Sequence, residues 1–389
     1  MHVPGWHEAT RAWQEAGDLQ MVGIIQEQHP DRARLFMQWK GMGWPILIDS
    51  LDLLETTVVP MTLLIDEHGV IRQIQPPRDQ LGELRANFLD VEFEAPHTAA
   101  DSSLPDMSET AASAVSAYLW ESDGDPDAVI AAFERAVDAD PEHGYTLFRA
   151  GVAYRWRYDS GAFRPDDFQR AVHYWERALS VDPNNYIWRR RIQQYGPRLA
   201  KPYSFYDWVA TARRDITARG GEPSPLVVEP GGAEFAQPQR TFTADEATLE
   251  PPELDGRIYR DDGQYVAVEA TMVPSAIRPG ASARAHVSFI PIEDIKAHWN
   301  NEVDDLVFWV DVPAGWQLDR CTVSVPNPPE TVSTETRTVE FEVKAPDDAS
   351  GRYELPGYAL YYVCEDVNGI CLYRRQDVSL VLEVAGPGS

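Results

Sequence analysis

A ten-residue motif that occurs twice is the feature that most restricts how this 389-residue chain can fold. Its first copy is Ala132–Pro141 (AFERAVDADP) and its second is Tyr174–Pro183 (YWERALSVDP), so the two closing prolines stand 42 residues apart. Both copies carry apolar residues at helical spacing and end at a helix-breaking proline. Repeated helical units bury their apolar faces by stacking on one another, which predicts a helical domain over residues 109–219.

The motif resembles the tetratricopeptide repeat, whose usual period is about 34 residues, so roughly eight residues are inserted here. We expect the insertion within Tyr158–Pro165, between the helices of the second unit. Helices over Tyr186–Tyr195 and Phe205–Ala218 are expected to cap the array. The resemblance implies that the repeats bind a protein partner.

The expected helices are rich in aromatic side chains. Their spacing favours packing between the repeats, and a concave peptide-binding surface is the alternative. These residues are Trp120, Tyr145, Phe148, Tyr154, Trp156, Tyr158, Tyr174, Trp175, Tyr186 and Trp188.

From about residue 256 the apolar pattern changes to alternation, which indicates β-strands. Proline and glycine separate the runs at a spacing typical of an antiparallel β-sandwich. The predicted strands are Gln264–Ala270, Ala283–Ile290, Leu306–Val312, Val339–Lys344, Tyr358–Cys364 and Val378–Val384.

The N-terminal ninety residues mix both periodicities, and the predicted order is α-β-α-β-β-β-α. The expected elements are a helix over 5–17, a strand over Leu19–Gln26, a helix over Pro30–Lys40, strands over Trp44–Asp49, Val58–Asp66 and Val70–Gln75, and a helix over 79–89.

The segment Val59–Ile71 (VPMTLLIDEHGVI) resembles a segment of the redoxin branch of the thioredoxin family. The resemblance implies an α/β thioredoxin-like domain over residues 1–90. It also makes Pro60 the cis-proline that faces the active site, and an ordinary trans proline is the alternative. Val3-Pro4 resembles the residues that follow the family's Cys-x-x-Cys motif, yet the chain contains no such motif. This domain is therefore expected to be inactive by itself.

In the family that this domain resembles, the strand leading into the Cys-x-x-Cys motif lies inside the sheet. Its loss would leave backbone groups of the neighbouring strands unpaired, and buried unpaired groups are costly. We therefore expect that the native protein starts upstream of Met1. The alternative is a degenerate domain kept for binding.

The segment Cys364–Cys371 (CEDVNGIC) lies between two predicted strands, and its Asn368-Gly369 pair favours a hairpin turn. A four-residue loop over 366–369 would place the two cysteines opposite each other, at a separation that suits a disulfide. A two-residue turn would instead place Cys364 opposite Tyr373. A bridge that closes so short a loop constrains the unfolded chain only modestly, which makes it a poor staple and a better redox switch.

This hairpin resembles the C-x-D-x-G-x-C-Y-P-P element in the N-terminal domain of membrane thiol:disulfide interchange proteins of the DsbD type. Cys364, Asp366, Gly369 and Cys371 fit that pattern with one extra residue between the cysteines, and Leu372-Tyr-Arg replaces Tyr-Pro-Pro. The resemblance implies an immunoglobulin-like domain whose cysteine pair exchanges electrons with thioredoxin-like proteins. A permanent structural bridge and a pair of free thiols are the alternatives.

Other candidate residues carry weaker signals. Cys321 lies within a strand pattern and is expected in the core. The segment 297–301 (AHWNN) precedes a strand, and we expect it to pack as a loop, with a pocket lining as the alternative. The remaining histidines show no metal-ligand spacing: His2, His7, His29, His68, His97, His143, His173 and His286. No nucleotide-binding glycine motif occurs either, so neither a metal nor a cofactor is expected.

The chain carries 62 acidic against 34 basic residues, for a formal net charge of −28. This charge repels nucleic acid and anionic membranes, so neither is expected as a partner. No apolar stretch is long enough to span a membrane. The N-terminus shows no signal peptide, so the protein is expected in the cytoplasm, or outside it if the true start lies upstream.

These patterns together predict a multidomain protein with an α/β, an all-α and an all-β part. The expected parts are a thioredoxin-like domain over 1–90, a linker over 91–108, helical repeats over 109–219, a linker over 220–255 and a β-sandwich over 256–386. Two of the three resemblances imply a thiol:disulfide oxidoreductase in which a thioredoxin-like centre exchanges electrons with Cys364 and Cys371. The rival hypothesis is a non-catalytic scaffold whose repeats bind a partner.

Overall fold

The computed structural model describes most of the chain, and the described residues fall into two compact units. The described ranges are 2–56, 59–77, 79–95, 107–120, 125–197, 208–228, 251–253, 256–367 and 369–386. The first unit comprises Met1–Ala153, Val181–Arg191 and Tyr203–Glu229, and the second comprises Tyr154–Ser180, Ile192–Pro202 and Pro230–Ser389. The division passes through three helices of the predicted repeat region, so the units do not coincide with the domains expected from sequence.

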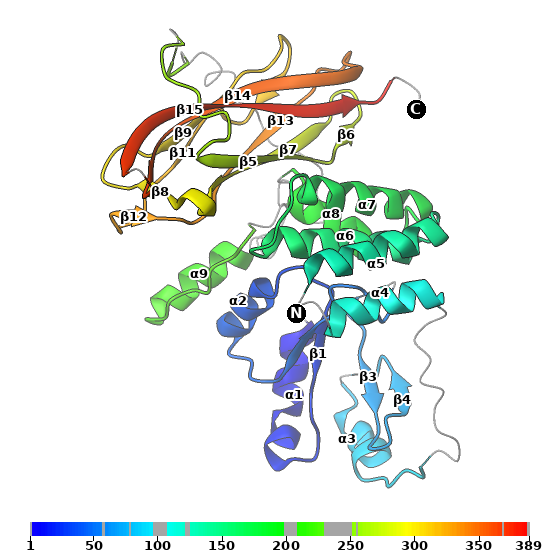
Figure 1. The fold of residues 1–389 in the computed structure, drawn as a ribbon. Coiled ribbons are helices and arrows are strands. Elements are labelled where there is room, and N and C mark those ends of the chain that lie inside the picture. Colours follow the sequence, from blue (N-terminus) through cyan, green and yellow to red (C-terminus); the bar gives the residue numbers. More distant parts are fainter. Residues whose placement is uncertain are drawn as a thin grey trace. The chain divides into compact units, whose positions relative to one another are not determined.

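The N-terminal part of the first unit follows the predicted order of elements, with shorter strands (Figure 1). Strand β1 pairs in parallel with β2, and β3 pairs with β4 as an antiparallel hairpin. A small core that includes Trp6, Trp44 and Leu64 holds these elements together. The elements are α1 (His2–Ala16), β1 (Gly23–Ile25), α2 (Asp31–Lys40), β2 (Ile46–Ile48), β3 (Leu63–Ile65), β4 (Ile71–Ile74), α3 (Leu81–Leu84) and a π-helical turn (Arg85–Leu89).

Six helices follow, and the repeated motif lies on two of them, α5 and α7. Helix α5 begins at a capping aspartate, because the Asp125 carboxylate accepts hydrogen bonds from two backbone N–H groups of the first turn. The helices are α4 (Glu109–Trp120), α5 (Pro126–Ala139), α6 (Gly144–Asp159), α7 (Asp167–Val181), α8 (Tyr186–Tyr195) and α9 (Trp208–Ala218). Residues 160–166 connect α6 to α7 and overlap the segment Tyr158–Pro165 where we expected the insertion.

Helix α9 packs against α2, a contact that the repeat pattern did not predict. Val209 and Ile216 of α9 share a core with Leu35, and Trp39 donates a hydrogen bond to Asp215 at 2.8 Å. The first three residues of the expected helix over Phe205–Ala218 lie outside the described ranges.

Two buried arginines of the helical region bind the loop after β2 in the same unit. Arg149 donates hydrogen bonds to the carbonyls of Leu51 and Asp52, both at 3.1 Å, and Arg191 donates to the Ser50 carbonyl at 3.1 Å. Burial, followed by the nearby carboxylate of Asp49, raises the pKa of the Asp52 carboxyl group to about 6. This loop therefore holds a buried acid whose charge is only partly compensated.

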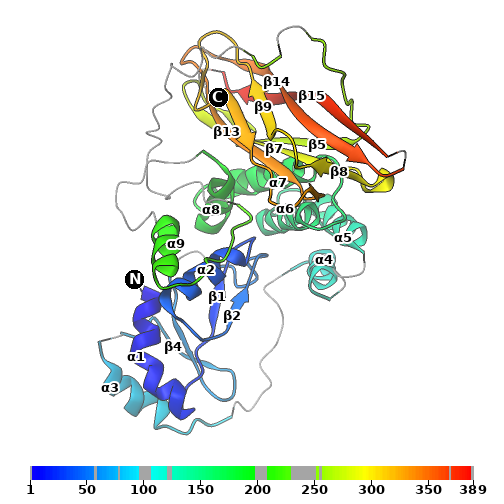
Figure 2. The same ribbon diagram turned by 90° about the vertical axis from the view of Figure 1, so that its left-hand side faces the viewer.

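The second unit contains two β-sheets that share one hydrophobic core (Figure 2). One sheet has the order β10-β13-β7-β5, and the other has the order β11-β9-β14-β15-β6 with β8 beside β14. The strands are β5 (Val266–Val273), β6 (Ala276–Ile277), β7 (Ser282–Pro291), β8 (Ala297–Asn300), β9 (Leu306–Val310), β10 (Gln317–Leu318), β11 (Thr322–Val325), β12 (Val332–Ser333), β13 (Arg337–Lys344), β14 (Gly351–Glu365) and β15 (Ile370–Val384). All six predicted strands are present, and the short strands β6, β8, β10, β11 and β12 were missed.

Helical residues of the second unit cover the outer face of the β5-β7-β13 sheet through polar contacts. The Tyr158 hydroxyl lies 2.8 Å from the Ser288 hydroxyl, and the backbone N–H of Ser275 donates to Glu176 at 2.8 Å. His286 is buried there, with Nε2 at 2.7 Å from the carbonyl oxygen of Tyr195. One outer face of the sandwich is thus closed by helices.

Among the described residues, none of the helices is long and apolar enough to cross a membrane.

Candidate functional site

The two cysteines of the predicted redox pair lie opposite each other near the tip of the β14–β15 hairpin. The register pairs Cys364 with Cys371 and Glu365 with Ile370, which leaves a four-residue loop over 366–369. The structure therefore selects the first of the two alignments considered from sequence, and Tyr373 opposes Tyr362 rather than Cys364. Gly369 has a φ of 69°, a left-handed conformation that glycine adopts without strain. Asn368, the other residue of the predicted turn, lies outside the described residues.

A disulfide joins Cys364 to Cys371, whose Cα atoms are 3.9 Å apart. The two ends of the bridge differ in exposure, because Cys364 is only 5% exposed whereas Cys371 is an exposed residue. Cys371 is therefore the end of the bridge that is more accessible to solvent. Cys321 is a free cysteine buried in the core, as its strand pattern predicted.

The segment that we expected to be a loop is strand β8, so that prediction was wrong. Ala297 and Trp299 point into the core, and His298 and Asn300 alternate with them on the outer face. Trp299 is fully buried and donates its indole N–H to the Glu335 carbonyl at 2.8 Å. The two-residue alternation was visible in the sequence, but a run of four residues is too short to separate a strand from a loop.

Strand β8 places His298 beside the disulfide. His298 is the register partner of Cys364, which is the partner of Cys371, so the three residues form one row across three antiparallel strands. Residues opposed in this way project from the same face, with Cβ atoms about 5 Å apart. Sequence reasoning missed this neighbour, because nothing in the local pattern connects β8 to β14.

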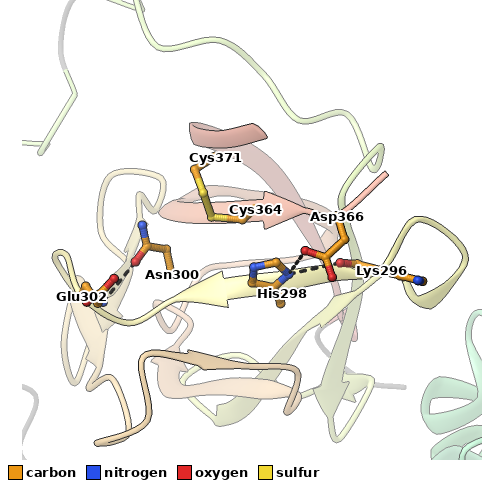
Figure 3. The surroundings of a disulfide bond; sticks show 7 residues. All are labelled: Lys296, His298, Asn300, Glu302, Cys364, Asp366 and Cys371. Carbon is orange, nitrogen blue, oxygen red and sulfur yellow. Dashed lines mark hydrogen bonds and ion pairs between the residues drawn. A yellow bond between two sulfur atoms is a disulfide. The ribbon is translucent and has the colours of Figure 1, made fainter. Parts of the chain in front are cut away.

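The imidazole of His298 is oriented by its surroundings (Figure 3). Its Nδ1 lies 3.2 Å from the carbonyl oxygen of Lys296, which can only accept a hydrogen bond, so Nδ1 carries a proton. The same nitrogen lies 3.9 Å from a carboxylate oxygen of Asp366 in the hairpin loop. Nε2 has no hydrogen-bond partner within the described part of the chain, and it is therefore available to exchange a proton.

Aromatic and aliphatic side chains surround the bridge. The rings of Tyr362 and Tyr373 lie 4.4 Å apart, on the cysteines' face of the hairpin. Burial, together with the neighbouring Tyr362, raises the pKa of Tyr373 above its ordinary value, so its hydroxyl is uncharged at neutral pH. Val367 and Ile370 at the hairpin tip are 64% and 40% exposed.

Pro60, the third candidate residue, belongs to the first unit, whereas the cysteine pair belongs to the second. The Val59–Pro60 peptide bond is cis. The Pro60 carbonyl accepts a hydrogen bond from the Gln75 side chain at 2.8 Å, just before β3. The chain has no cysteine before Cys321, so no thiol of this unit could meet Pro60.

No group of three or more histidine, cysteine or acidic side chains is arranged to hold a metal ion among the residues that the structure describes.

Comparisons with known proteins give no family. No family model and no curated protein matches the chain. AvmM, which catalyses macrocyclization in alchivemycin A biosynthesis, matches at 18% identity and a TM-score of 0.20, over 34% of this chain and 99% of AvmM. The sporulation control protein Spo0M from Bacillus subtilis matches at 13% identity and a TM-score of 0.17, over 32% of this chain and 50% of Spo0M. At scores this low, neither likeness supports an argument about fold or function.

Proposed function

We propose that this chain is a thiol:disulfide oxidoreductase-like protein whose Cys364–Cys371 pair exchanges electrons with a thioredoxin-like protein. The observation that carries the proposal is the asymmetry of the bridge, with one cysteine exposed near a hairpin tip and the other buried beside a histidine. Thiol–disulfide exchange needs an accessible sulfur to be attacked and a second sulfur to leave. Cys371 suits the first role and Cys364 the second.

The exchange would proceed through a mixed disulfide. A partner thiolate attacks Cys371, a bond forms between these two sulfurs, and the Cys364–Cys371 bond breaks with its electron pair moving to Cys364. A second partner thiolate then attacks its own sulfur in the mixed disulfide and releases Cys371. The partner dithiol is oxidised to a disulfide, and the cysteine pair takes up two electrons and two protons as two thiols.

The resemblances seen in the sequence complete this proposal. The N-terminal part of the first unit would be a thioredoxin-like domain that is inactive in this chain, because it holds no thiol. The helices α4–α9 would form a tetratricopeptide-like repeat domain with its capping helices, and the sandwich would be an immunoglobulin-like domain of the DsbD type. The natural partner would then be a thioredoxin-like protein that carries a Cys-x-x-Cys motif.

Native-state thiol labelling of the full chain tests the proposal. The chain is purified without reductant, treated with dithiothreitol at low concentration, alkylated while folded and weighed by mass spectrometry. We expect one added alkyl group, on the exposed Cys371, while Cys364 and Cys321, which are both buried, are labelled only after the chain unfolds. A thioredoxin whose resolving cysteine is serine should form a mixed disulfide with Cys371, and C371S should abolish it while C321S does not. A bridge that resists reduction until the chain unfolds would show a structural staple instead.

A non-catalytic scaffold is the second candidate, and one observation favours it. Trp120, at the end of α4, is 81% exposed, and an exposed tryptophan is typical of a protein-binding surface. Most other aromatic residues of the helices are buried or half-buried, including Phe148 and Trp175. If W120A abolished capture of a partner by a chain whose two cysteines are serine, the scaffold would be favoured.

A further inference from the structure

Three observations place a proton source beside the sulfur that leaves during exchange. His298 is the direct register neighbour of Cys364 on the same sheet face. Its Nδ1–H is directed to the Lys296 carbonyl, which leaves Nε2 as the nitrogen that gains or loses a proton. Its side chain is 17% exposed, so water can return a proton to the imidazole.

From this geometry we infer that His298 donates the proton that the Cys364 thiolate takes up when the bridge is reduced, and accepts it back when the bridge forms. The inference rests on the proposed exchange function and names the acid–base group of that same site. In reduction, the bond between Nε2 and its proton breaks as a bond forms between that proton and the Cys364 sulfur. Imidazolium becomes imidazole, and water later restores the proton.

A proton donor is useful at Cys364 in particular. Cys364 is buried, and a thiolate released there would be a poorly solvated anion. Cys371 is exposed, so water can stabilise its thiolate without help. The histidine thus stands beside the only sulfur of the pair that needs it.

Of the charged side chains near His298, Asp366 is the one that faces the imidazole. One of its carboxylate oxygens lies 3.9 Å from Nδ1. The side chain of Lys296 extends away from the imidazole in Figure 3. Glu302 lies beyond Asn300, and the side chain of Glu365 belongs to the opposite face of β14.

The test is the pH dependence of bridge reduction in the full chain. The rate of reduction by dithiothreitol is measured from pH 5 to 9 and divided by the concentration of the reagent's thiolate. For the wild type, this normalised rate should fall as pH rises through the histidine range, because the imidazolium is lost. The bridge of H298Q should be reduced about tenfold more slowly at pH 6, and its normalised rate should show no pH dependence in this range.

Matched variants separate the outcomes. H68Q removes a histidine that also lies near a carboxylate, 3.8 Å from Glu67, and should leave the profile unchanged. A wild-type profile in folded H298Q would overturn the role of His298 while leaving the exchange function standing. A native bridge that dithiothreitol cannot reduce in either protein would overturn the proposed function itself.

Discussion

The two sheets of the second unit each carry one histidine on the outer face, and the two sites differ in how they are covered. His286 on β7 is 5% exposed, and its Nδ1 lies 3.0 Å from a carboxylate oxygen of Glu340. His298 on β8 lies 3.9 Å from Asp366, whose side chain is 64% exposed. Helical residues close the first site, whereas the second stands beside an exposed disulfide.

The comparison shows what burial does to a pair formed by a histidine and a carboxylate. Burial alone raises the pKa of Glu340, but the hydrogen bond from His286 and the nearby Arg284 outweigh it and hold that pKa below its usual range. Burial also lowers the pKa of His286, although both of its ring nitrogens face oxygen acceptors and only the imidazolium donates to both. The buried charges therefore depend on one another, whereas solvent reaches both His298 and Asp366.

Breaking the buried pair should have the largest effect on stability. E340A leaves Arg284 and His286 without their carboxylate, and we expect the free energy of unfolding to fall by about 3–5 kcal/mol. Urea unfolding of the full chain measures the loss, and hydrogen exchange of β7 and β13 locates it. E383A breaks an exposed pair with Arg352 and should change stability by less than about 0.5 kcal/mol.

The buried pair of His286 and Glu340 should also determine how the free energy of unfolding changes at low pH. Because the folded-state pKa of Glu340 is lowered, its contribution is present above the ordinary glutamate pKa of about 4.3 and is lost as the pH falls below it. Between pH 5 and pH 3, E340Q should therefore lose less stability than the wild type. Equal losses would mean that Glu340 is not held ionised by its partners.

Removal of the bridge should cost less than removal of Glu340. The bridged residues are seven positions apart, and closing so short a loop stabilises the fold by about 2.5 kcal/mol. The C364S/C371S double variant and the wild type reduced with dithiothreitol should show this same loss in urea unfolding. A loss above about 5 kcal/mol would identify the bridge as a staple rather than an exchange site.

A buried carboxylate in the first unit should respond to pH in the opposite direction from Glu340. The pKa of Asp52 in the folded protein is raised to about 6, so the folded protein binds this proton more tightly than the unfolded chain does. The free energy of unfolding therefore falls as the pH rises from about 4 to 6. D52N removes that loss, and at pH 8 the variant should be more stable by about 2 kcal/mol. Thermal melting at pH 4 and pH 8 measures the difference, which should vanish at pH 4.

Substitution of His298 should have the smallest effect on stability. H298Q should change the free energy of unfolding by less than about 0.5 kcal/mol, because the side chain is partly exposed and its ion-pair partner is largely solvated. Urea unfolding at pH 7 provides the measurement. A loss above about 2 kcal/mol would give His298 a structural role like that of His286, and the contrast between the two sites would disappear.

Much of the secondary structure followed from periodicity in the sequence. The alternating runs predicted the six longer strands of the sandwich, and the repeated motif predicted helices at α5 and α7. Short apolar runs were less informative: β1 and β2 are three residues long, although longer strands were expected. The packing of α9 on α2 depends on side chains far apart in the chain, which local patterns do not report.

The sequence alone established that Cys364 and Cys371 flank a turn and that a bridge between them would close a short loop. Its local preferences left two alignments open, because turn residues favour a hairpin without fixing the loop length. A shift of two residues keeps every side chain on its own face, so the alternation in the sequence could not choose between them. The tertiary structure decided the alignment, with Cys364 opposite Cys371 and with β14 also paired to β8 and β9. It also decided that His298, 66 residues before Cys364, lies beside it, because pairing between distant strands depends on burial of the whole sheet.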